Sequence, residues 1–423
     1  MEISRSEPKK NSRINRQQWS LLIALAFVFV GAVGCINDLE PQGGWSSPVV
    51  EDGKFYLGNR DGNLVRFKPE SDSVDLNWRY PREDGLGAMY SSPIIVGDHI
   101  FGAGYTCRGN KCDGEVFGLD IAGGNSIWGQ RGLELSTKLV GPIGIVDSTL
   151  LVGTGAISEE DGGPDGYLYG IDTSANSSSL VKWRIPLDGN AWSGVAVDGS
   201  SAYVATMSGT VYAINASDEE RFALDPLSRI QWTFSTGSAI AGPLHVDGGS
   251  IFFGDLENNA YKLRASVRSS VNSSSDIDRG SGEWKFDTGT WVWAKPIVEG
   301  GVVYVSGLDG SIHALDEDTG SEKWSASVDG QIVASPTLFD RKRGDTRERA
   351  LAVPSGDRNV WVISVIDGRE LGVFVTDEPV KAKPVVYENL LYVHSMNGEL
   401  KWFSLDDASQ RGCVDLKEGG RCG

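Results

Sequence analysis

Three acidic residues follow one another in the segment GSIHALDEDTGSEKW (310–324), where Asp316, Glu317 and Asp318 occupy a short loop. Carboxylate oxygens are the ligands that Ca²⁺ prefers, so a crowded acidic loop is one way to hold this cation. The segment has a second interpretation. An alternating run, a polar turn and a strand that ends in Trp324 are typical of one unit of a repeat.

The cysteines are the second set of residues with possible chemistry. Cys107 and Cys112 flank four residues, and Cys413 and Cys422 flank eight. Four cysteines allow three pairings, and the short loops favour the two local ones. In an oxidising compartment we expect both pairs to be disulfides. Zinc is the alternative, but CxxC pairs are absent and the four histidines are scattered, so no metal site is predicted.

The fifth cysteine, Cys35, follows a segment that is typical of an export signal. Five basic residues precede the apolar run LLIALAFVFVGAVG (21–34), which is short for a membrane span of ~20 residues. Ala32-Val33-Gly34-Cys35 resembles a bacterial lipobox, although Ala replaces the usual Leu three positions before the cysteine. We therefore expect a signal peptide over 1–34, lipid attachment at Cys35, a tether over 35–42 and a location at the outer face of a bacterial membrane. An uncleaved anchor or a plain signal peptide are the alternatives.

Composition narrows the function classes. The 423 residues are 40% hydrophobic and 23% charged, and the net charge is −18. Phosphate recognition needs a basic face, so this charge argues against a nucleic-acid partner. The 54 glycines and 13 tryptophans, with few long apolar helical patterns, favour short strands and tight turns.

A repeat runs through the chain from about residue 43. The strand in GSIHALD has eight copies spaced 40–52 residues apart, among them GNLVRFK from Gly62, GTVYAIN from Gly209 and GELKWFS from Gly398. Each copy is preceded by an element such as SSPVV, AKPIV or AKPVV and by a further alternating run. Units of about 48 residues with four short alternating strands predict an all-β protein, an eight-bladed β-propeller of four-stranded antiparallel blades over 43–423.

A tryptophan follows the polar turn in six of the eight copies. We expect each ring to lie on an outer strand and to pack between blades, with its indole N–H hydrogen-bonded. The seventh and eighth copies have Gly372 and Cys413 near this place. The six residues are Trp78, Trp128, Trp183, Trp232, Trp284 and Trp324.

The repeat also decides the question of the acidic loop. LDEDTG changes to FKPESD, IDTSAN and LRASVR in other copies, and the three carboxylates are not kept. We therefore interpret Asp316, Glu317 and Asp318 as a hairpin turn.

The pattern of a proline with apolar residues, an alternating run, G-x-l-Y-a-l-D and a final Trp resembles the PQQ-like, or quinoprotein-type, propeller repeat. The resemblance covers nearly the whole mature chain. It is specific for the fold, but much less so for the function. Some members of this family are dehydrogenases that bind pyrroloquinoline quinone and calcium over the axis. Another branch is the lipoprotein propeller of the outer-membrane β-barrel assembly machinery, which is a scaffold for protein partners. The signal, Cys35, the eight repeats and the length are more similar to this second branch.

We therefore expect a non-catalytic, membrane-anchored scaffold with protein partners in the cell envelope and no cofactor. No catalytic residue is predicted, since no GxSxG, HExxH or Walker motif occurs. A PQQ- and calcium-dependent dehydrogenase and a propeller that binds cell-wall polysaccharide are the alternatives. Three insertions interrupt the repeat and are expected to be solvated loops: the acidic 157–166, the Ser-rich 264–282 and the basic 340–349.

Overall fold

The structure is a computed structural model. The chain divides into two units, 1–42 and 43–423, and only the second is described here. The predictions for the signal peptide, Cys35 and the tether therefore lie outside the described residues. The structure describes residues 44–82, 85–108, 111–129, 131–156, 163–174, 179–219, 225–266, 272–273, 283–343 and 346–422.

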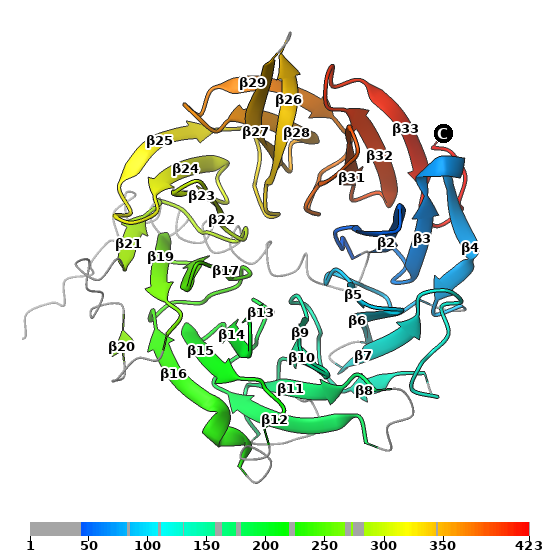
Figure 1. Ribbon diagram of the computed structural model, residues 1–423, viewed down its shortest axis with the longest axis vertical. Helices are drawn as coiled ribbons and strands as arrows, with labels where there is room; N and C mark the ends of the chain where they lie inside the picture. The colour runs from blue at the N-terminus through cyan, green and yellow to red at the C-terminus, as the bar shows by residue number, and fades with distance from the viewer. Residues whose placement is uncertain are drawn as a thin grey trace, which may run out of the picture. The chain divides into compact units, whose positions relative to one another are not determined.

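Eight sheets arranged in a ring make up this unit, and each has four antiparallel strands in sequence order (Figure 1). The prediction of an eight-bladed β-propeller is confirmed. Blade 1 comprises β1 (Val49–Glu51), β2 (Lys54–Gly58), β3 (Leu64–Lys68) and β4 (Ser73–Tyr80). Blade 2 comprises β5 (Ile94–Val96), β6 (His99–Arg108), β7 (Lys111–Asp120) and β8 (Leu133–Leu135). Blade 3 comprises β9 (Gly144–Val146), β10 (Thr149–Gly153), β11 (Gly166–Asp172) and β12 (Val181–Leu187).

The middle blades follow the same plan. Blade 4 comprises β13 (Val195–Asp198), β14 (Ser201–Ala205), β15 (Thr210–Asn215) and β16 (Ile230–Ser235). Blade 5 comprises β17 (His245–Asp247), β18 (Ser250–Gly254), β19 (Asn259–Arg264) and β21 (Trp284–Asp287). A short strand, β20 (Asn272–Ser273), adds to the outer edge of blade 4 in parallel with β16. This fifth strand was not predicted from the sequence, because it comes from the Ser-rich insertion in the next repeat.

The last three blades complete the ring. Blade 6 comprises β22 (Ile297–Glu299), β23 (Val302–Ser306), β24 (Ser311–Asp316) and β25 (Glu322–Ser327). Blade 7 comprises β26 (Thr337–Arg343), β27 (Thr346–Pro354), β28 (Asn359–Ser364) and β29 (Glu370–Val375). Blade 8 comprises β30 (Val385–Tyr387), β31 (Leu390–His394), β32 (Glu399–Ser404) and β33 (Gln410–Asp415). Two 3₁₀ turns, Pro69–Ser71 and Pro226–Arg229, lie between third and fourth strands.

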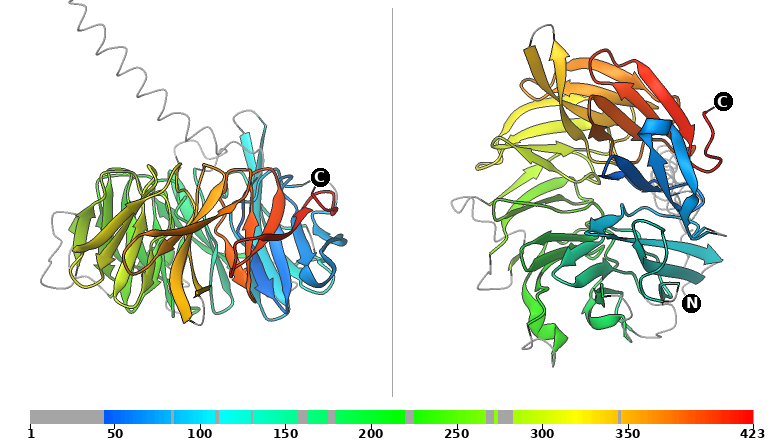
Figure 2. Two further views of the ribbon diagram at one scale, coloured as in Figure 1. Left: turned by 90° about the horizontal axis from the view of Figure 1, so that it is seen from above. Right: turned by 45° about the vertical axis from the view of Figure 1, so that its right-hand side comes forward.

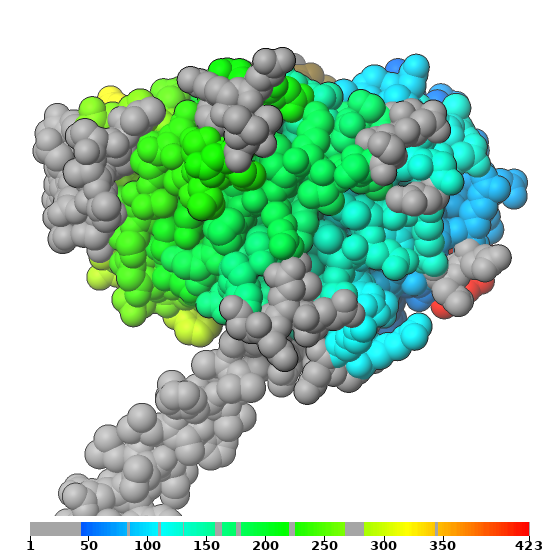
Figure 3. Space-filling model, turned by 90° about the horizontal axis from the view of Figure 1, so that it is seen from below, coloured from blue at the N-terminus to red at the C-terminus, as the bar shows by residue number. Residues whose placement is uncertain are grey.

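The first strand of each blade lies nearest the axis and the fourth lies at the rim (Figure 1). Figure 3 shows successive parts of the chain following one another around the side of the ring as the colour passes from cyan to green. We call the face on which each first strand begins the entry face. Because the strands alternate in direction, the turns between second and third strands lie on this face too. The opposite face, here called the turn face, carries the turns between first and second and between third and fourth strands.

In six of the eight blades the tight turn before the third strand has a backbone requirement that favours glycine. Gly310 has φ +92° and Gly209 has φ +87°, which side chains rarely adopt. Asn258 (φ +69°) and Arg358 (φ +74°) occupy the same place in blades 5 and 7 without being glycine. Blades 5 and 7 therefore keep the positive φ of this turn although their residue at this position is not glycine.

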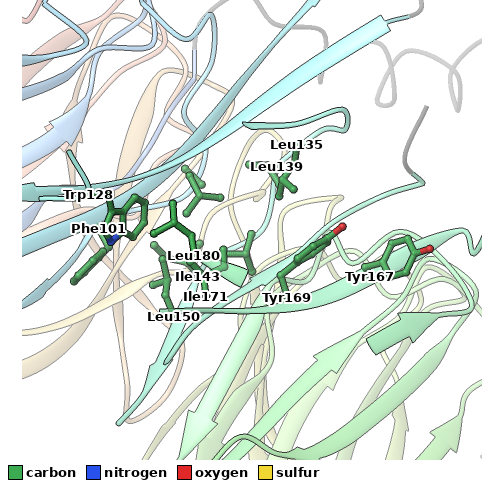
Figure 4. Packing of buried hydrophobic residues seen from close by; sticks show 13 residues of the cluster. Phe101, Trp128, Leu135, Leu139, Ile143, Leu150, Tyr167, Tyr169, Ile171 and Leu180 are labelled. Carbon is green, nitrogen blue, oxygen red and sulfur yellow. The ribbon is translucent and has the colours of Figure 1, made fainter. Parts of the chain in front are cut away.

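The core lies between the blades. Between blades 2 and 3, Phe101 and Trp128 pack with Ile143, Leu150 and Tyr169 (Figure 4). Comparable clusters of buried side chains join the other neighbours. Since one sheet cannot bury its own faces, each blade depends on both neighbours for its stability.

Blade 8 meets blade 1 through packing, because each is built from its own end of the chain. Phe55 and Phe67 of blade 1 share a cluster with Tyr392 and Trp402 of blade 8. The backbone N–H of Lys383 donates to Ser47 Oγ at 2.8 Å, close to the axis. The described chain thus closes without exchanging a strand between the two ends.

Candidate functional site

The residues just before each first strand gather around the axis at the entry face. They belong to the proline-containing element of the repeat or lie directly before it. In two copies this element begins Ala-Lys-Pro. These copies place Lys295 and Lys383 two residues before β22 and β30. We call this region, with its neighbours Trp45, Tyr90, His245 and Lys381, the axial mouth.

Lys295 and Lys383 are cations that have no counter-charge among the residues that the structure describes. None of the described carboxylates forms an ion pair with either ammonium group. Desolvation lowers the pKa of both groups, and the charge of Lys383 lowers the pKa of Lys295 further. The Lys383 side chain is nevertheless exposed to solvent. Lys383 is therefore surrounded by protein and still reaches solvent, as a residue that lines a channel does.

His245 of blade 5 lies within reach of the same charges. Desolvation and then the charge of Lys295 lower its pKa to about 4, with a smaller contribution from Lys383 in the same direction and an opposing one from Asp247. His245 is therefore neutral near pH 7. Three basic groups from blades 5, 6 and 8 thus interact electrostatically across the axis.

Aromatic side chains border this group. The rings of Trp45 and Tyr90 meet edge to face with their centres 4.3 Å apart. The Nζ of Lys381 lies 4.9 Å from the centre of the Trp45 ring, within the range of a cation–π contact. All three side chains keep partial exposure. The axial mouth therefore combines cations with flat apolar rings, a chemistry suited to acidic or anionic groups.

The acidic loop does not form a cation site. Asp316 accepts hydrogen bonds from the backbone N–H groups of Asp318 and Thr319, at 3.2 and 3.0 Å. Its ion pair with Lys323, at 2.8 Å, is the main cause that lowers the pKa of Asp316 to about 2. The Glu317 carbonyl oxygen accepts from Trp284 and from Lys262. The interpretation of this loop as a hairpin turn agrees with these contacts.

Both cysteine pairs are disulfides. Cys107 and Cys112 face each other near the tip of the β6–β7 hairpin, which rises from the entry face in cyan (Figure 2). Cys413 of β33 bonds to Cys422 near the C-terminus. Glu399 lies beside this second pair, but sulfurs bonded to each other are not thiolate ligands for zinc.

The basic insertion forms the extended hairpin of β26 and β27. Arg349 of this insertion forms ion pairs with Glu299 of blade 6 at 2.5 Å and with Asp340 at 3.4 Å. One cation of the insertion is therefore paired with the neighbouring blade. Lys342 and Arg347 face each other in the register and are both exposed. The insertion 157–166 and most of 264–282 lie outside the described residues.

Each of the six repeated tryptophans lies against the following blade. Trp78 packs with Ile100 and Leu119 of blade 2, and Trp284 packs with Val303 and Leu315 of blade 6. The other four rings have equivalent neighbours in the clusters at their boundaries. The indole N–H groups of Trp128 and Trp183 are buried and have no hydrogen-bond partner in the described part of the chain.

Sequence reasoning missed two features of the last blades. The register places Gly412, not Cys413, at the tryptophan position of blade 8, and Trp402 lies opposite it on the third strand. It also missed the axial lysines. The signal for them was present, since Lys stands before the proline in only two of the repeat's copies. No helix among the described residues is long and apolar enough to cross a membrane.

Comparisons with known proteins agree with this geometry. The family described as "Outer membrane protein assembly factor BamB" matches residues 222–371, which is less than half of the chain. The outer membrane protein assembly factor BamB of Yersinia pestis is 24% identical over 345 residues, which cover 78% of this chain and 78% of that protein. BamB of Pseudomonas aeruginosa is 25% identical over 218 residues, which cover 49% of this chain and 50% of that protein.

Solved structures show the same fold. The crystal structure of BamB from Moraxella catarrhalis matches with a TM-score of 0.58 and 16% identity, covering 84% of this chain and 93% of that one. The computationally designed Ika8 protein matches with a TM-score of 0.61 and 11% identity, covering 86% and 96%. The resemblance to PQQ-like propellers of the BamB type, expected from the repeat, is confirmed.

Proposed function

We propose that this PQQ-like propeller is an exported, non-catalytic scaffold, anchored by a lipid on Cys35, that binds protein partners during outer-membrane protein assembly. The observation that carries the proposal is the sequence likeness to an assembly factor, which extends over 78% of both chains. A likeness of this extent includes most of the ring rather than one repeat.

The charge at the axial mouth favours this proposal over a quinoprotein dehydrogenase. A calcium ion near this end of the axis would be repelled by the ammonium groups of Lys295 and Lys383, which have no paired carboxylate among the described residues. The residues at this mouth therefore do not fit a calcium-bound cofactor. They fit an acidic group of a partner instead, because a carboxylate would compensate two cations that form no ion pair with a described residue.

The tip of the β26–β27 hairpin offers a second basic contact. Lys342 and Arg347 lie directly opposite each other, and like charges in this arrangement destabilise a hairpin. An acidic surface on a partner would relieve that repulsion. The hairpin tip lies on the turn face and the axial mouth on the entry face, so the two contacts face opposite directions.

The proposed anchor gives the ring a position at the membrane. Gly44 lies just before the first strand of blade 1, at the entry face. The nine residues from Cys35 to Gly43 span at most about 30 Å when extended. A lipid on Cys35 would therefore tether the propeller to the bilayer through a segment of at most this length.

Deletion of the gene in the native host tests the proposal. We expect lower amounts of folded β-barrel proteins in the outer membrane, restored by the wild-type chain and only partly by the Cys35→Ser variant. Unchanged β-barrel levels together with loss of a quinone-dependent oxidation would favour the dehydrogenase. Unchanged β-barrel levels together with lost binding to purified cell-wall polysaccharide would favour a propeller that binds this polysaccharide.

A further inference from the structure

One blade boundary lacks the tryptophan that the others use. At four boundaries an indole N–H donates to the carbonyl oxygen of the residue just after the third strand of the next blade. The pairs are Trp78 to Ile121 at 3.0 Å, Trp232 to Ala265 at 3.3 Å, Trp284 to Glu317 at 2.8 Å and Trp324 to Val365 at 3.1 Å. The ring fills the gap between blades, and the carbonyl oxygen orients it.

The register shows how room is made for three of the rings. Trp183 lies opposite Gly170, Trp232 opposite Ala213 and Trp324 opposite Ala314, so a small residue on the third strand accompanies the large one on the fourth. Trp284 lies opposite Lys262 instead. Blade 8 uses the reverse order. Trp402 on the third strand lies opposite Gly412 on the fourth, and a side chain on Gly412 would collide with the Trp402 ring.

Blade 7 has neither arrangement. Val362 on the third strand lies opposite Gly372 on the fourth, so neither position of this pair carries a large side chain. A side chain atom added at Gly372 would meet nothing within 4 Å. An indole-sized volume is therefore missing at the boundary between blades 7 and 8.

A cavity of about 290 Å³ marks this place. Phe339 and Phe374, each only 2% exposed, belong to its lining, and Arg341, Leu371 and Leu405 also line it. Leu405 directly follows the third strand of blade 8, so its carbonyl oxygen occupies the position that accepts the indole N–H at the other boundaries. None of the described residues donates a hydrogen bond to this oxygen. We call this cavity the Gly372 slot.

The lining of the slot is mixed, since Arg341, Asp406 and Asp407 belong to it together with the apolar residues. Elsewhere on blade 7, Ile366, in the turn before β29, is 77% exposed, and Val375, at the end of β29, is 54% exposed. They are the two most exposed large hydrophobic side chains in the described part of the chain, but neither lines the slot.

We propose that the Gly372 slot binds a tryptophan side chain presented by a partner polypeptide. The slot has the walls and the free carbonyl oxygen that hold an indole elsewhere in this ring. Its volume lies at the lower end of the range for ligand pockets, which suits one aromatic side chain. The inference deepens the proposed function, on which the identity of the polypeptide rests, because it gives a partner's recognition element.

A small probe tests the slot independently of the assembly role. N-acetyl-tryptophanamide should bind the purified propeller saturably with one equivalent, as followed by ligand-observed NMR. It should bind at least tenfold more tightly than N-acetyl-leucinamide. Val362→Trp copies the arrangement of Trp402 and Gly412 in blade 8, so it should fill the slot and weaken probe binding at least tenfold. Lys323→Trp adds an indole to the exposed outer strand of blade 6 and should bind the probe as the wild type does.

A second variant covers the case in which Val362→Trp does not fold. Gly372→Trp fills the slot from the fourth strand, although the backbone at φ +149° would have to adjust. No saturable binding to the wild type would overturn the proposal, and so would undiminished binding to a folded slot-filling variant. Probe binding that is lost in the variant, with normal β-barrel levels in a gene deletion, would leave the slot standing and remove only the assembly role.

Discussion

The indole N–H of Trp284 donates to the carbonyl oxygen of Glu317 at 2.8 Å, across the boundary between blades 5 and 6. The same ring is 1% exposed and packs against Val303 and Leu315. Trp284 therefore has two roles: it fills the gap between two sheets, and it donates one hydrogen bond to a carbonyl group just beyond the end of a strand.

Trp284→Ala should lower the free energy of unfolding by about 3–5 kcal/mol, because it leaves a large cavity between two sheets. Trp284→Phe keeps most of the apolar contact and should cost about 1–2 kcal/mol, chiefly for the lost hydrogen bond. Trp324 is more exposed, so Trp324→Ala should cost less than Trp284→Ala. Urea unfolding followed by circular dichroism measures all three. Lys285→Ala is the neighbouring control and should stay within about 0.5 kcal/mol of wild type.

A cost below about 1 kcal/mol for Trp284→Ala would contradict the packing role. So would a broad, multi-step transition already in the wild type, since closure of the ring should couple the blades into one unfolding unit.

Arg358→Gly should stabilise the protein. Arg358 is exposed and has φ +74°, where five other blades have glycine or asparagine at the matching turn. Relieving this conformation gains about 1–2 kcal/mol, and the greater freedom of glycine in the unfolded chain returns part of it, leaving about 0.5–1 kcal/mol. Arg358→Ala keeps the conformational penalty and is the matched control. Equal stability of the Gly and Ala variants would show that the backbone at 358 is unstrained.

Replacing the axial lysines should change the pH dependence of stability. The pKa of Lys295 and Lys383 lies below the ordinary 10.5 in the folded protein, so between the two values the unfolded chain binds more protons. Stability contributed by these groups therefore rises with pH up to about 10.5. The double variant Lys295→Met, Lys383→Met should lose this rise and melt at or above the wild-type temperature at pH 7. Lys342→Met changes an exposed lysine and should keep the wild-type profile.

A lower melting temperature of the double variant at pH 7 would mean that the ammonium groups are compensated in the folded protein. The axial mouth would then not be an open site for an acidic partner.

Cys35→Ser should release the protein from membranes or leave the precursor unprocessed, because the thiol that would carry the lipid is gone. Fractionation and mass measurement of the mature N-terminus distinguish these results. Unchanged processing and membrane retention would instead identify residues 20–34 as a plain anchor.

The sequence predicted the features that repeat along the chain. The turn glycines, the alternating strands and the six tryptophans recur with a repeat of about 48 residues, and each of them reflects a local requirement of one blade or one boundary. The disulfides were predictable for the same reason, since each closes a short loop.

Features made by several blades at once were not predictable in this way. Lys295 and Lys383 are 88 positions apart and meet only because the ring brings first strands to one axis. Blade 8 carries its tryptophan at position 402 of the third strand instead of at position 412 of the fourth, and blade 7 has none at either matching position. Both features become visible only when the register pairs Trp402 with Gly412 and Val362 with Gly372. A linear motif carries no information on such cross-strand pairing.

The central claim is that this propeller holds protein partners at the outer membrane. Its most direct test is in vivo cross-linking followed by purification of the full-length protein from native membranes and identification of the bound polypeptides. We predict that subunits of the β-barrel assembly machinery are recovered, and that fewer are recovered with Lys295→Met, Lys383→Met than with Lys342→Met. Recovery of cell-wall polysaccharide without these subunits, or of the propeller alone, would contradict the account.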